Sequence, residues 1–183
     1  MNTFNTERVV DCLTKVIKSI DTEKKPEPAE IQWQIEMEAM NLIQENLIEE
    51  AIFLFDLILD PFASGTAILN RAKSYRILGQ YEKALYDLNR LADSVADDNY
   101  LISMPLYLER VLVNERLQQR ANMLKDIVKF ISIIGKHKDK ISFSNRDDNL
   151  DAKVAKFGEP PSLVFSMTGK ICSIVSEEQK ISE

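Results

Sequence analysis

The sequence Ala67-Ile-Leu-Asn-Arg-Ala-Lys-Ser-Tyr-Arg-Ile-Leu-Gly-Gln-Tyr-Glu-Lys-Ala-Leu-Tyr-Asp-Leu88 predicts a helix, a tight turn at Gly79 and a second, antiparallel helix. Glycine favours this turn because it readily adopts the left-handed backbone conformation that ends many helices. Ala72 and Ala84 are small enough to let the two helices approach closely, and the larger Tyr75 can fill the space beside them. The stretch therefore predicts a helical hairpin.

A second copy of this hairpin precedes the first, offset by 33 residues. Asn46 takes the place of Gly79, which suits a helix end because asparagine tolerates the left-handed conformation better than most residues. The return helix of this copy, residues 51–59, is apolar nearly all round, and such a helix is buried on more than one side. The aligned pairs are Ile35 with Ile68, Ala39 with Ala72, Leu42 with Tyr75, Ala51 with Ala84 and Phe55 with Leu88.

A third, more divergent copy follows at an offset of 39 residues. Gln118 replaces the turn glycine and Met123 replaces the small alanine, so we expect looser or shifted packing. Divergence is expected in a terminal repeat, because its outer face has no further repeat to pack against. The aligned pairs are Ile68 with Tyr107, Arg71 with Arg110, Leu78 with Leu117, Ala84 with Met123 and Leu88 with Ile127.

The three copies resemble the tetratricopeptide repeat (TPR), a helix–turn–helix unit of about 34 residues that stacks into scaffolds for binding other proteins. The resemblance covers residues 30–136 and implies repeats at about 32–64, 65–98 and 104–137. It predicts an all-α fold, a TPR helical-hairpin solenoid whose repeat domain occupies residues 29–140.

The flanking segments are predicted from local patterns. Residues 1–28 hold an amphipathic helix, expected over Glu7–Ile20 with Asn5 or Thr6 as its cap, and then a charged linker with two prolines. That helix either docks on the repeats, occupies their groove or serves as a separate partner-binding arm. Residues 141–183 are expected to hold a loop, a C-terminal capping segment and a tail, and Leu163–Val175 fits either a helix or a strand.

Composition narrows the functional class. The net charge of −6 over 183 residues argues against a nucleic-acid partner, because the phosphate backbone demands a basic surface. No stretch approaches the roughly 18 apolar residues that span a bilayer, and the N-terminus lacks the apolar core of a signal peptide. Cys12 and Cys172 lack the spacing of a zinc or redox site. We expect no membrane span and a cytoplasmic protein, with the nucleus also compatible.

Motifs that carry chemistry are not found in the sequence. His137 is the only histidine and lies in a lysine-rich stretch. Residues 147–151 resemble the opening of a calcium loop, but Ala152 and Gly158 stand where a glycine and a glutamate are needed. A glycine-rich phosphate loop, a paired-histidine metal motif and a nucleophile elbow are likewise missing. We expect no enzyme activity, no cofactor and no metal.

The TPR resemblance implies that the first helix of each repeat lines a concave groove, with its second, fifth, sixth, ninth and twelfth positions facing the ligand. Trp33 and Met40 stand out, because neighbouring positions already supply the packing face of their helix. Lys73 and Arg76 could select an acidic flank of the ligand. The expected groove residues are Trp33, Glu36, Met40, Thr66, Leu69, Asn70, Lys73, Arg76, Leu108 and Leu112.

Well-known ligands of the TPR family are acidic C-terminal peptides of cytosolic chaperones, held by a clamp of cationic and asparagine side chains. Only Asn70 matches that clamp, and carboxylates at cation positions repel a peptide carboxylate. A chaperone partner is therefore expected only through a mode without an intact carboxylate clamp. Within the family, the three-repeat layout is similar to the small group called tetratricopeptide repeat protein 36, described as chaperone partners. The clamp positions that depart are Glu36, Met40, Pro105 and Glu109.

These observations favour a non-catalytic adaptor or co-chaperone-like module that binds a peptide or helix of another protein in its concave groove. In the first alternative, the chain is a structural subunit of a larger assembly and the apolar helix Ala51–Leu59 is partly an interface. In the second, an enzyme or small-molecule site is built from a buried polar cluster that sequence does not reveal.

Overall fold

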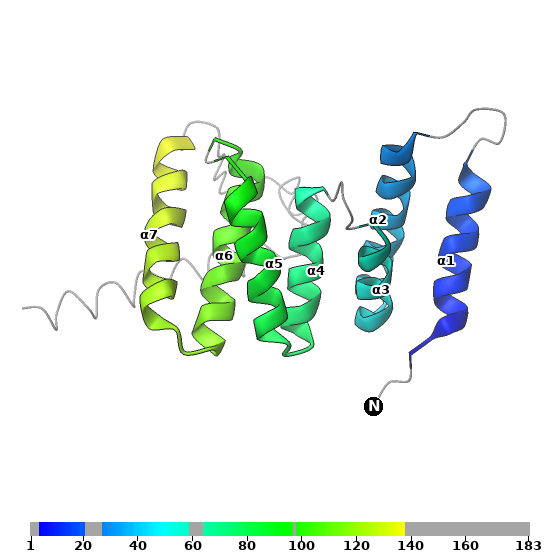
Figure 1. Ribbon diagram of the computed structural model, residues 1–183, viewed down its shortest axis with the longest axis horizontal. Coiled ribbons are helices and arrows are strands. Elements are labelled where there is room, and N and C mark those ends of the chain that lie inside the picture. Colours follow the sequence, from blue (N-terminus) through cyan, green and yellow to red (C-terminus); the bar gives the residue numbers. More distant parts are fainter. Residues whose placement is uncertain (1–3, 21–26, 59–63, 97, 138–183) are drawn as a thin grey trace, which may run out of the picture. The chain divides into compact units, whose positions relative to one another are not determined.

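The computed structural model describes residues 4–20, 27–58, 64–96 and 98–137. These residues form seven α-helices, and none of the described ranges contains a strand (Figure 1). The prediction of an all-α fold is therefore confirmed for these residues. The expected loop and capping segment of residues 141–183 lie outside the described residues. The helices are α1 (Thr6–Ser19), α2 (Pro28–Gln44), α3 (Ile48–Ile58), α4 (Gly65–Ile77), α5 (Tyr81–Ser94), α6 (Tyr100–Arg116) and α7 (Arg120–His137).

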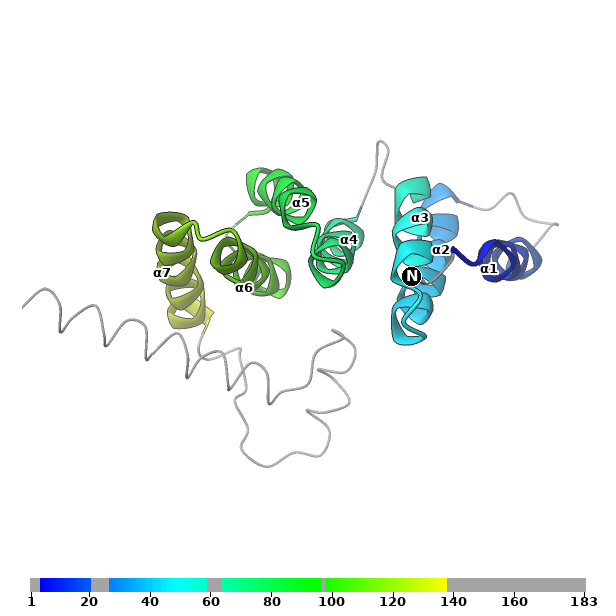
Figure 2. The same ribbon diagram turned by 90° about the horizontal axis from the view of Figure 1, so that it is seen from below.

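Helices α2 to α7 form three antiparallel hairpins. Helix α2 packs on α3, and α4 packs on α5. In the third hairpin, Asn114 of α6 donates a hydrogen bond to Asp126 of α7 at 2.9 Å. Successive hairpins also touch, because α4 contacts α2 and α3 on one side and α6 on the other. Figure 2, which looks along the helices, shows α4 and α5 followed by α6 and α7.

The three hairpin turns share one backbone conformation. Asn46, Gly79 and Gln118 all have positive φ, at 62°, 73° and 57°. In each turn the next residue donates its N–H to the carbonyl five residues back, at 2.8 to 2.9 Å, which is the bond of a Schellman motif. The sequence alignment places these three residues at the same point, and the backbone confirms that placement.

The small residues that the sequence predicts at the helix crossings are buried in the core. Ala39, Ala51, Ala72 and Ala84 are all buried, with at most 1% of their surface exposed. Burying a methyl group at the crossing lets the helix axes approach, and larger neighbours then fill the space around it. In the third hairpin the larger Met123 takes this place and is also buried.

A buried ion pair recurs in two of the hairpins. Arg71 of α4 donates two hydrogen bonds to Asp87 of α5, at 2.6 and 2.8 Å. Thirty-nine residues later, Arg110 of α6 lies 2.9 Å from Asp126 of α7. Both aspartates are almost fully buried, so the arginine is needed to compensate the charge. The first hairpin has Leu54 at the aspartate position and lacks this pair.

Helix α1 docks on the first hairpin and belongs to the same compact unit, Met1–Gly135. Its side chains Val9, Cys12 and Val16 are buried. The Asn5 side chain caps the helix by accepting the N–H of Arg8 at 3.0 Å, which confirms one of the two expected caps.

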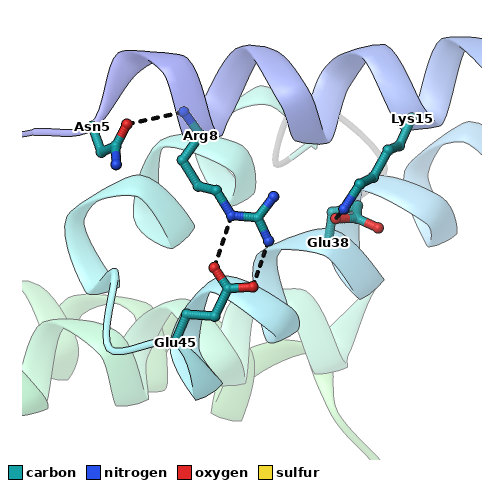
Figure 3. Close-up of polar contacts among 5 residues, drawn as sticks. All are labelled: Asn5, Arg8, Lys15, Glu38 and Glu45. Carbon is teal, nitrogen blue, oxygen red and sulfur yellow. Dashed lines mark hydrogen bonds and ion pairs between the residues drawn. The ribbon is translucent and has the colours of Figure 1, made fainter.

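Polar contacts fix α1 antiparallel to α2 (Figure 3). Arg8 near the start of α1 donates to Glu45 at the end of α2, at 2.8 Å from its Nε. About two helical turns further along α1, Lys15 lies 3.9 Å from Glu38. Among the alternatives left open by the sequence, the structure therefore selects docking on the repeats.

Candidate partner-binding surface

One face of α2 exposes large apolar side chains. Trp33 is 61% exposed and Met37 is 45% exposed, while Met40 is half-buried. These residues recur at intervals of four and three, so they lie along one side of the helix. The opposite side of α2 carries Ala39 and Leu42, which are fully buried in the core.

Neighbouring helices cover the other sides of α2 and leave this face open. Glu38 and Glu45 mark the side turned to α1, since their partners are the α1 residues Lys15 and Arg8. Glu36 marks the side turned to the next hairpin, because it accepts a hydrogen bond from Ser64 at 2.9 Å. Helix α1 therefore does not cover Trp33, although an occupied groove was one of the expected arrangements.

The equivalent face of α4 is more polar. The 33-residue offset pairs Met37 with Asn70 and Met40 with Lys73, and it pairs Gln44 with Ile77. Asn70 and Lys73 are half-buried, as is the predicted Thr66, and Ile77 is 51% exposed. We call the combined surface the α2–α4 face; it consists of Trp33, Met37, Met40, Thr66, Asn70, Lys73 and Ile77.

Three predicted groove residues contact a neighbouring hairpin or the core, and one of them, Glu36, still borders the open face. Leu69 is only 4% exposed and belongs to the core, so its side chain offers no surface to a partner. Arg76 donates to the buried Glu109 of α6 at 2.7 Å, so its guanidinium is already paired, and the selection of an acidic ligand by Arg76 stays a prediction. Glu36, with its bond to Ser64, is the third.

Helix geometry explains why these predicted groove residues turn towards a neighbouring hairpin. Glu36 and Arg76 lie on the side of α2 or α4 that meets the following hairpin, and Leu69, seven residues before Arg76, shares its side of α4. Leu108 of α6 corresponds to Leu69, yet it is half-buried, as is Leu112.

Met37 and Ile77 belong to the open face but escaped the sequence prediction. The signal for Met37 was present, because it follows Trp33 by four residues and therefore shares its side of the helix. Ile77 carried a weaker signal, since it comes just before the turn at Gly79, where a helix end can be covered or open.

The ionisable groups of the described residues serve mainly to hold helices together. The Arg8 hydrogen bond lowers the pKa of Glu45 below its usual value. Burial raises the pKa of Asp126 despite its contacts with Arg110 and Asn114. Burial, helped by the nearby Glu38, raises the pKa of Cys12 to about 11.

A shallow cleft of about 390 Å³ lies between α4 and α5, and four of its six lining residues, Arg71, Tyr75, Lys83 and Asp87, contact one another. Arg71 pairs with Asp87 and with Asp56, and both Arg71 and Lys83 approach the ring of Tyr75, at 5.6 and 5.3 Å from its centroid. In the described part of the chain, no group of three or more His, Cys, Asp and Glu side chains could hold a metal ion.

The chain was compared with known protein families, with curated proteins and with solved structures. None of the three comparisons gives a match. Separately, no described helix combines the length and the apolar character that crossing a membrane requires.

Proposed function

We propose that this protein is a non-catalytic interaction module of the TPR type, an adaptor or co-chaperone-like protein that holds a peptide or helix of a partner on the α2–α4 face. The observation that carries the proposal is the exposure of Trp33, at 61%, beside the exposed Met37. An exposed tryptophan next to a flexible, polarisable methionine is typical of binding surfaces. The tryptophan offers a partner a large apolar anchor, and fixing its side chain costs little conformational entropy.

The shared design of the three hairpins supports the TPR assignment. Each turn has a residue in the left-handed conformation at the same position, and the buried alanines of the first two hairpins follow the predicted offset. Such units stack so that each hairpin contacts its neighbours and the array presents a continuous binding surface. A cytoplasmic location accords with this role and with the composition.

The ligand of the proposed module is not an acidic peptide held by a carboxylate clamp. Among the clamp positions, Glu109 is buried against Arg76, and Glu36 accepts from Ser64. Both positions hold carboxylates where the clamp needs cations, and Arg76 cannot substitute for them without giving up Glu109. A chaperone could bind only in another way.

Affinity capture from cell extract tests the proposal with the double variant Trp33→Glu/Met37→Glu. Both side chains are exposed, so the variant is expected to fold, and circular dichroism checks that it does. We expect a small set of captured proteins to be lost or reduced at least about tenfold, which corresponds to about 1.4 kcal/mol. Equal capture by the native chain and this variant would reject the α2–α4 face as the binding surface.

Exposed apolar side chains on α3 support the structural-subunit alternative. Phe53 and Leu57 on α3 are 41% and 51% exposed, and the ring of Phe4 stacks edge-to-face on Phe53 at 5.9 Å. The other apolar residues of α3 are buried within this chain, which accounts for most of the apolar character of that helix.

The variant Phe53→Glu/Leu57→Glu serves as both the matched control and the test of this alternative. It introduces the same charges at similar exposure but on another helix. Unchanged capture by this variant, together with a monomeric native chain in sedimentation, supports the adaptor. Loss of capture or of self-association in this variant alone favours the subunit.

A further inference from the structure

The segment that contains the first hairpin carries only negatively charged side chains. Residues 27–70 contain no lysine, arginine or histidine, but they contain nine carboxylates. A segment of this length without a single cation creates a negative local potential unless other segments supply the opposite charge. The carboxylates are Glu27, Glu30, Glu36, Glu38, Glu45, Glu49, Glu50, Asp56 and Asp60.

Neighbouring helices neutralise the sides of this hairpin that they touch. Helix α1 supplies Arg8 to Glu45 and Lys15 to Glu38 (Figure 3). Helix α4 supplies Arg71, whose guanidinium lies 2.6 Å from Asp56. The compensating cations therefore lie on the covered sides of the hairpin.

Within the described helices, the open face around Trp33 receives no such compensation. Glu30 and Glu36 are three residues before and after Trp33, so they are its neighbours on the helix surface. Glu36 accepts from the neutral hydroxyl of Ser64, which leaves its charge in place. Among the residues that the structure describes, neither carboxylate forms an ion pair. Lys73 of α4 corresponds to Met40 and so lies about two helical turns from the level of Trp33.

We propose that the partner segment bound on the α2–α4 face is basic, and that it places a lysine or arginine side chain against the indole of Trp33, between Glu30 and Glu36. This inference rests on the proposed function and names the chemistry of its ligand. The indole face attracts cations more strongly than any other side-chain ring, and two flanking carboxylates add to that attraction. Apolar residues of the same segment then cover Met37 and Met40.

The net charge of the chain also favours a basic partner segment over an acidic one. A protein of net charge −6 attracts basic segments and repels acidic ones at a distance. Steering of this kind raises the rate of association, whereas the contact at Trp33 slows dissociation. An acidic segment would meet repulsion at both stages.

The only tryptophan of the chain is Trp33, so its fluorescence reports on this site alone. The probes are two synthetic amphipathic helical peptides with identical leucine positions, one carrying lysines and the other glutamates on the polar face. We expect the lysine peptide to change Trp33 emission and to bind at least about tenfold more tightly than the glutamate peptide. Its affinity should fall as salt is added, because salt screens exposed charges.

Two charge variants separate the local contact from the net charge. In Glu30→Gln/Glu36→Gln the preference for the lysine peptide should fall about fivefold to tenfold. Glu49→Gln/Glu82→Gln removes the same charge from exposed positions away from the face and should leave most of the preference intact. Equal effects of the two double variants would overturn the local contact.

The outcomes distinguish this inference from the proposed function. If the glutamate peptide binds as tightly as the lysine peptide, or if neither changes Trp33 emission, the basic ligand is rejected. The proposed function nevertheless stands if Trp33→Glu/Met37→Glu still abolishes capture from extract. If that variant captures the same proteins as the native chain, the α2–α4 face is not the binding surface and both proposals fail.

Discussion

Trp33 is exposed to solvent and is also flanked by two carboxylates. Its indole is 61% exposed, yet it lies on a helix whose opposite side is packed in the core. Exposing a side chain of this size forgoes roughly 2 kcal/mol of burial that a covered position would provide. The sequence retains it beside Glu30 and Glu36, where a covering segment of this chain would have to bury two carboxylates as well.

Ionic quenchers measure that environment directly, without any partner. We predict that caesium quenches Trp33 more than iodide does, after both are normalised to neutral acrylamide, because Glu30 and Glu36 attract the cation. In Glu30→Gln/Glu36→Gln the caesium-to-iodide ratio should fall about twofold to threefold. Equal ratios in the native chain and this variant would show that the two carboxylates do not set the potential at the indole.

Of the two described non-glycine residues with positive φ, Asn46 and Gln118, it is Gln118 whose side chain tolerates that backbone less well. Its φ of 57° is the left-handed conformation, which costs a residue with a Cβ atom roughly 1 kcal/mol. Gly79 adopts the same conformation at the equivalent turn without that cost.

We therefore predict that Gln118→Gly raises the free energy of unfolding by about 0.5–1 kcal/mol. Gly79→Ala should lower it by a similar amount, although a Cβ atom at Gly79 meets no neighbouring atom, because the cost lies in the backbone alone. Urea denaturation followed by circular dichroism measures both changes. A neutral Gln118→Gly together with a neutral Gly79→Ala would contradict the shared turn strain.

At the scale of helices, the sequence predicted the hairpins and their turns well, for a physical reason. The period of 3.6 residues fixes which side of each helix is apolar, and a left-handed residue such as Asn46 or Gly79 fixes where the helix ends. These signals are local, so one sequence suffices to find them. The residues at the crossings, such as Ala72, follow from the same local pattern.

The side of each helix that the next hairpin covers is not a local property. The direction in which one hairpin stacks on the next decides it, and that depends on packing over many residues. The TPR resemblance therefore placed Leu69 and Arg76 in the groove, whereas Leu69 is buried in the core and Arg76 pairs with Glu109 of α6. The role of Trp33 and Met40 in binding stays a prediction.

Helix α1 provides a prediction at this scale, because Cys12 lies on its buried side. The thiol has no exposed surface, and burial raises its pKa to about 11. In a Cys172→Ser background we predict that Cys12 reacts with a thiol reagent at pH 8 at least about a hundredfold more slowly than in urea, since reaction requires the thiolate and access to it. The rate then reports how often α1 leaves the first hairpin.

The pH dependence of this docking follows from the direction of the shift. The thiol loses its proton more readily when α1 is detached, so the stabilisation is complete below the pKa of the free thiol and is lost as pH rises towards 11. Arg8→Ala, which removes the bond to Glu45, should accelerate the reaction at every pH. An exposed control, Lys18→Ala, should not. Fast labelling of the native chain would show that α1 is mostly undocked.

Across residues 4–137, the described helices pack mainly with their neighbours in the chain. Helix α1 contacts α2 and α3, the first hairpin contacts α4, and the second hairpin contacts α6. Ion pairs reinforce these junctions, with Asp56 to Arg71 at the first and Arg76 to Glu109 at the second. Stability in such an arrangement is approximately a sum of hairpin and junction terms, and the loss of one junction should act locally.

Glu109 tests this local behaviour, because it is 2% exposed and its partner Arg76 belongs to the preceding hairpin. We predict that Glu109→Ala costs about 2 kcal/mol, since it removes a buried, charge-assisted bond. Native-state hydrogen exchange should show the loss in α6 and α7, while amides of α2 and α3 keep their protection, because the first junction retains Asp56 and Arg71. The exposed Glu115→Ala in the same helix is the control and should change exchange little. A uniform loss of protection from α1 to α7 would instead mean that the helices unfold as one cooperative unit. A partner bound on the α2–α4 face would then stabilise the third hairpin as strongly as the first.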